Sequence, residues 1–64
     1  MTFTIVLSEA DKPDYRGIIL SKAVLINIVE NADPKCYNIK IGNDLFQGRK
    51  LFLDANKLIC EFNV

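Results

Sequence analysis

The amino-acid sequence predicts a mostly β fold, either a small antiparallel sheet or a five-stranded barrel. Residues 50–64 alternate apolar and polar side chains with the period of two that marks a strand with one buried face. Elsewhere, short runs rich in Ile, Val and Leu are separated by segments of turn-forming residues. Strands this numerous in so short a chain tend to curl into a barrel, which removes exposed edges.

The first strand is expected over Thr2–Ser8, where Phe3, Ile5 and Leu7 alternate with Thr and Val. A polar loop follows over residues 9–17. Residues 18–30 allow two interpretations, of which we favour a strand, because Ile and Val prefer extended backbone. The alternative is an α+β fold of β-α-β-β-β order, with residues 18–30 helical and covering one sheet face, and with Ser21 capping a shorter version of the helix.

The second half of the chain reads as turns and strands. Asn31–Lys35 predicts a turn, since the residue before a proline avoids helical geometry. A strand is expected over Tyr37–Ile41 and a short one at Leu45–Phe46. Gly48 indicates a bulge or a bend.

Residues 50–64 form a β-hairpin around the turn Asp54–Lys57. An even number of loop residues places Leu53 opposite Leu58, Leu51 opposite Cys60 and Lys50 opposite Glu61, a favourable ion pair. A slip of one residue would mix the two faces. The even register leaves Phe52 opposite Ile59 on the otherwise polar face. That pair is either covered by another part of the domain or belongs to a surface that contacts a partner.

Length and composition predict a single small domain, residues 1–64. Half of the residues are hydrophobic, which is enough for a core. A chain this short buries only about 60% of its unfolded surface, so it often needs a metal, disulfides or a second subunit. With no histidine and two cysteines, we expect neither a metal site nor a disulfide framework, and no cofactor. A bridge between Cys36 and Cys60 stays open, although free thiols are the simpler interpretation.

Free thiols predict a cytoplasmic protein. No run approaches the roughly 20 apolar residues of a transmembrane helix, so we expect no membrane partner. Catalysis is not expected either, because the usual base is histidine and neither cysteine lies in a Cys-x-x-Cys motif. The acidic residues of the first loop lack the glycine and closing glutamate of a calcium loop.

With catalysis, metals, cofactors and membranes not expected, two kinds of partner are consistent with the sequence. The first is another protein, which this chain would bind as a small regulator or inhibitor, or as a homodimer. The expected contact residues are Phe52, Ile59, Lys50, Arg49 and Lys40. We also expect the last strand to lie at a sheet edge, where it can pair with another chain. The alternative is a small β-barrel that binds nucleic acid through interleaved aromatic and basic side chains, although the formal net charge is zero.

Overall fold

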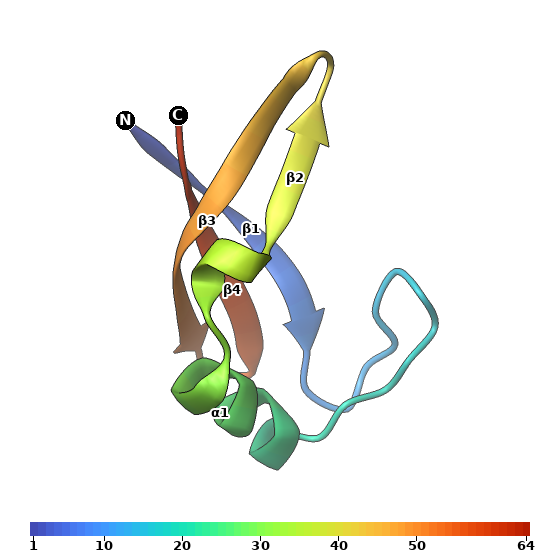
Figure 1. Ribbon diagram of the computed structural model, residues 1–64. Helices are drawn as coiled ribbons and strands as arrows, with labels where there is room; N and C mark the ends of the chain where they lie inside the picture. The colour runs from blue at the N-terminus through green and yellow to red at the C-terminus, as the bar shows by residue number, and fades with distance from the viewer.

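The computed structural model describes all residues from Met1 to Val64 as one curled antiparallel sheet with one short α-helix (Figure 1). In chain order the elements are β1 (Thr2–Glu9), α1 (Lys22–Asn31), the 3-10 turn η1 (Pro34–Cys36), β2 (Asn38–Ile41), β3 (Asp44–Asp54) and β4 (Lys57–Asn63). The mostly β fold with a small antiparallel sheet is therefore confirmed. The sheet has four strands and curls into a half-barrel rather than a five-stranded barrel.

The strand order across the sheet is β1-β4-β3-β2. The last strand, β4, lies between β1 and β3 and is hydrogen-bonded to both. The expectation that it forms a sheet edge is wrong, because the first strand returns to pair with it. The two edges are β1 and β2.

The register expected for the final hairpin is confirmed at each pair. Leu53 lies opposite Leu58, and Phe52 lies opposite Ile59. The register then shifts between Gly48 and Lys50, so the bulge indicated by Gly48 is present, with Arg49 as its extra residue. The short strand expected at residues 45–46 is part of the longer β3.

The strand favoured for residues 18–30 is wrong, and the helical alternative is correct from Lys22 onward. Ser21 caps the helix, its hydroxyl accepting a hydrogen bond from the backbone N–H of Val24 at 3.4 Å. Leu25, Ile28 and Val29 then share the side that faces the sheet. Burial of that side outweighs the extended preference of Ile and Val, because tertiary packing overrides intrinsic propensity.

The core lies on the concave side of the sheet, between the strands and α1. Phe62, Leu25 and Cys60 are its fully buried side chains. Phe62 stacks on Phe3 with 5.4 Å between ring centroids, and Phe3 meets Phe46 edge-on at 5.2 Å. These contacts hold the curled strands around one cluster of rings.

Cys36 is exposed, Cys60 is buried and both are free thiols. The only α-helix has 10 residues, and no helix is long and apolar enough to cross a membrane.

Candidate protein-interaction surface

The convex side of the sheet carries a row of apolar side chains that crosses three strands. Ile59 on β4 lies opposite Val6 on β1 and opposite Phe52 on β3. Val6 is 52% exposed, and Phe52 and Ile59 are half-buried. None of the three packs against the core cluster, which lies on the other side of the sheet. We call the row Val6–Ile59–Phe52, with the charged residues beside it, the outer surface.

Charged side chains border this row on the same side of the sheet. Lys50 lies opposite Glu61, as expected, but the ion pair of Glu61 is with Arg49, at 3.4 Å between Nη1 and Oε2. The bulge brings the Arg49 guanidinium to Glu61. Lys50 instead places its ammonium 5.6 Å from the ring centroid of Phe52, within the range of a cation–π contact. An apolar centre with a charged border is the usual anatomy of a protein interface.

The structure brings together four of the five residues expected to contact a partner. Phe52, Ile59 and Lys50 are neighbours, and Arg49 joins them through Glu61. Lys40 does not belong to this group. It lies on β2 opposite Leu45, seven positions along β3 from Phe52, which corresponds to roughly 24 Å of extended chain.

Val6 belongs to the outer surface but was not among the residues that the sequence analysis singled out. Its only signal was an apolar side chain at a position of the first strand otherwise filled by Thr2 and Thr4. The sequence alone could not place Val6 beside Ile59, because this requires knowing that β1 pairs with β4. The nucleic-acid alternative gains no such grouping, since Tyr37 and Phe46, two of the three aromatic residues in the interleaved aromatic and basic pattern, pack against the core.

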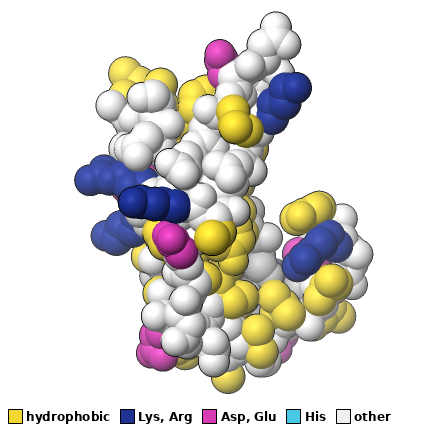
Figure 2. All heavy atoms as spheres, viewed as in Figure 1, with side chains coloured by type: hydrophobic (Ala, Val, Ile, Leu, Met, Phe, Trp, Pro, Cys, Tyr) yellow, Lys and Arg dark blue, Asp and Glu magenta, His cyan; other side chains and the backbone are white.

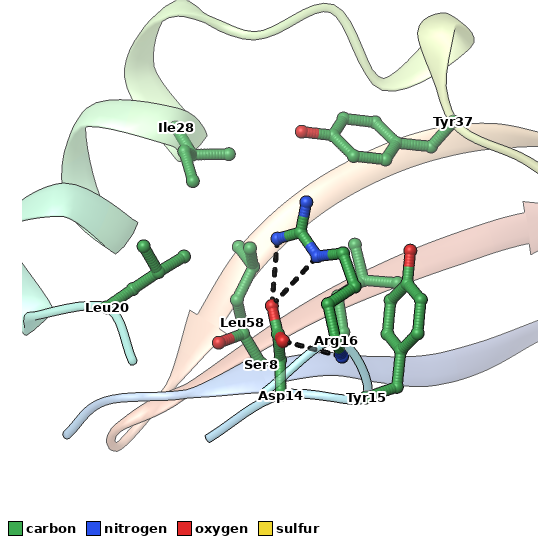
Figure 3. A pocket seen from close by; sticks show the side chains of 9 residues that line it. Ser8, Asp14, Tyr15, Arg16, Leu20, Ile28, Tyr37 and Leu58 are labelled. Atoms are coloured by element: carbon green, nitrogen blue, oxygen red, sulfur yellow. Dashed lines mark hydrogen bonds and ion pairs between the residues drawn. The ribbon is translucent and has the colours of Figure 1, made fainter. Parts of the chain in front are cut away.

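A cavity of about 320 Å³ lies on the concave side, between the loop at residues 14–16 and the body of the protein (Figure 3). Figure 2 shows the same loop standing out at the right, with a hollow between it and the rest of the surface. The lining side chains come from β1, the loop before α1, α1, the chain before β2, and β4: Leu7, Ser8, Asp14, Tyr15, Arg16, Leu20, Ile28, Tyr37 and Leu58.

The ionised groups of this cavity bind one another. The Asp14 carboxylate accepts hydrogen bonds from the Arg16 side chain at 2.8 and 3.2 Å and from the backbone N–H groups of Arg16 and Ile18 at 2.8 and 3.0 Å. The hydrogen bond from Arg16 lowers the pKa of Asp14 and raises that of Arg16. Asp14 therefore holds the loop in its conformation, and its carboxylate oxygens are already hydrogen-bonded within the loop.

Burial and, after it, the nearby Glu61 carboxylate raise the pKa of the Cys60 thiol. A raised pKa keeps a thiol protonated and weakly nucleophilic at neutral pH. Cys60 is therefore a small apolar core residue.

A scan of the chain against protein-family models found no matching family, and searches of curated proteins and of solved structures likewise found no match.

Proposed function

We propose that this protein works by binding another protein, as a small non-enzymatic regulator or inhibitor that docks on a larger protein. The observation that carries the proposal is the apolar row Val6–Ile59–Phe52, which lies on the side of the sheet away from the core cluster and includes the 52% exposed Val6. The setting is the cytoplasm, where two unpaired thiols are stable.

Charge supports a protein as the partner rather than nucleic acid. The formal net charge is zero, whereas nucleic-acid-binding domains usually carry a clear basic excess. Within the outer surface, the guanidinium of Arg49 is paired with Glu61. Arg49 therefore brings no net positive charge to this surface, and the apolar row is left as its main contact area.

The test uses Phe52→Asp in an affinity capture from a source-like lysate, with and without nuclease and with identification by mass spectrometry. A carboxylate at the centre of an interface costs about 2 kcal/mol or more, so recovery of the partner should fall by roughly thirtyfold. The matched control is Leu45→Asp, which adds the same charge to the same strand at a site that is 70% exposed. It should retain the partner.

A second variant, Val6→Asp, separates binding from folding, because Val6 is more than half exposed and its substitution leaves the core intact. All three variants should show cooperative thermal unfolding. A partner that is lost on nuclease treatment, or that is retained equally by Val6→Asp and Phe52→Asp, contradicts the proposal. Unfolding of Phe52→Asp would mean that Phe52 belongs to the core.

A further inference from the structure

The two edge strands of the sheet differ in how they are protected from pairing with another chain. β2 has only four residues and carries Lys40, and shortness and lysine are both common protections of an edge. β1 has eight residues, and its first part, Thr2–Val6, contains neither a charge nor a proline. After Val6 the register shifts, and residues 13–15 lie beside the end of the strand, from Val6 to Glu9. The open edge is therefore Thr2–Val6.

The pairing with β4 shows which backbone groups of this segment face outward. The N–H of Val64 donates to the carbonyl of Met1 at 3.0 Å, so Met1 and Val64 form a hydrogen-bonded pair. Such pairs alternate along an antiparallel ladder, so Phe3 and Ile5 also bond to β4. The N–H and C=O groups of Thr2, Thr4 and Val6 point away from β4, and β1 has no strand on that side.

We propose that a second copy of this chain pairs with the open edge of β1, giving a symmetric dimer with one continuous eight-stranded sheet. The two β1 strands run antiparallel with Thr4 opposite Thr4 of the second copy, and Thr2 opposite Val6 of the second copy. In this register all three residues of each copy whose backbone groups point away from β4 form hydrogen bonds. It forms about six hydrogen bonds, two at each of its three hydrogen-bonded pairs.

The side chains suit this self-pairing. On the convex side, Thr4 meets Thr4 and Thr2 meets Val6, which are favourable β-branched pairs. On the concave side, Phe3 meets Ile5, which extends the apolar core across the boundary. No charges face each other, and a net charge of zero leaves little repulsion between copies. The same patch serves both copies, as a twofold interface requires.

This dimer does not depend on the docking proposed above, since it forms through the backbone edge of β1, and Val6 is the one residue that it shares with the outer surface. The twofold axis is perpendicular to the sheet, so both outer surfaces face the same side. A larger partner would meet two apolar rows at once, which favours partners that are themselves symmetric.

Cysteine cross-linking tests the register. In a Cys36→Ser background, Thr4→Cys places two thiols opposite each other, within the 4.4–6.8 Å Cα separation that a disulfide bridges. The matched control is Thr2→Cys, whose two copies lie about 14 Å apart in this register. On mild oxidation, Thr4→Cys should become a covalent dimer and Thr2→Cys should stay monomeric. Equal cross-linking of both variants, or none, overturns the proposal.

A proline tests the edge without relying on oxidation. The N–H of Thr4 is not used in the ladder with β4, so Thr4→Pro should keep the monomer folded. In the dimer it removes both hydrogen bonds of the central pair, which should weaken self-association by about a hundredfold. Sedimentation equilibrium should show twice the 7.2 kDa monomer mass for the parent chain and the monomer mass for the variant. A monomeric parent chain, or a variant that dimerises equally well, contradicts the proposal.

Discussion

At the scale of single residues, Asp14 shows how a polar loop residue becomes structural. The sequence places it in an acidic loop and predicts only a solvated side chain. In the structure its side chain is 1% exposed and its carboxylate holds Arg16 and the backbone of the loop. The sequence could not reveal this, because the contact depends on how residues 10–20 fold back on themselves.

The depressed pKa of Asp14 makes a prediction about acid stability. A carboxyl whose pKa is lower in the folded protein stabilises it above the ordinary value of 3.8, and this contribution is lost as the pH falls through the folded pKa. Asp14→Asn should therefore lower the thermal midpoint at pH 7, and its difference from the parent chain should shrink towards pH 3. Thermal unfolding followed by circular dichroism at several pH values measures this.

The control for Asp14→Asn is Asp11→Asn, in the same loop. Asp11 takes part in none of the three ion pairs, and asparagine tolerates its positive φ of 62°. Removing this carboxylate breaks no ion pair, so the thermal midpoint at pH 7 should stay close to that of the parent chain. Equal acid sensitivity of the parent chain and Asp14→Asn would show that the loop is not held by this carboxylate.

At the scale of elements, the strands were predictable and the helix was not. Residues 2–8 and 50–64 carry a period of two that only a half-buried strand explains, and the pairing of Leu53 with Leu58 followed from it. Residues 22–31 carry strand-forming Ile and Val at positions that also fit a helix. The side of this segment that becomes buried is the one that packs on the concave face of the sheet. That face forms only after strands distant in sequence have paired.

The turn of the final hairpin contains a strained position that can be relieved. Ala55 has a φ of 54°, a left-handed conformation that costs an L-residue about 1–2 kcal/mol. Ala55→Gly removes that cost but adds freedom to the unfolded chain, so a net gain of about 0.5–1 kcal/mol is expected. This corresponds to a rise of a few degrees in the thermal midpoint, measurable by calorimetry.

The matched control lies in the same turn. Asn56 has no positive φ, so Asn56→Gly gains nothing in the folded state and should lower the midpoint. A midpoint that falls for Ala55→Gly as well would show that the turn does not limit the stability of the hairpin.

At the scale of the whole molecule, the core is small and depends on one side chain of α1. Leu25 is fully buried, whereas its neighbours Val24 and Ile26 are 43% and 40% exposed. Figure 2 shows apolar side chains still open to solvent along the lower part of the molecule.

The candidate site, like the fold, was predictable from the sequence only in part. The hairpin register placed Phe52 beside Ile59. Val6 and Lys40 depended on the strand order, which no local pattern encodes.

Leu25→Ala should therefore unfold much of the population. Such a substitution in a core costs about 2–5 kcal/mol, and a domain of this size has only about 3–5 kcal/mol from its core. Urea denaturation followed by circular dichroism measures the loss. Ile26→Ala, one residue along the same helix and exposed, should stay within about 0.5 kcal/mol of the parent chain. A loss below about 1 kcal/mol for Leu25→Ala would mean that α1 is not anchored by this residue.

The position of β4 between β1 and β3 also constrains how the chain reaches its folded state. β2, β3 and β4 follow one another through short turns, so their pairing closes small loops. β1 meets β4 through residues that are far apart in sequence, such as Thr2 and Glu61 at 59 positions, and this closure carries a larger entropy cost. Loop-closure entropy thus favours the three-stranded meander as the folding nucleus, and we expect β1, which precedes the meander in the chain, to pair after it has formed.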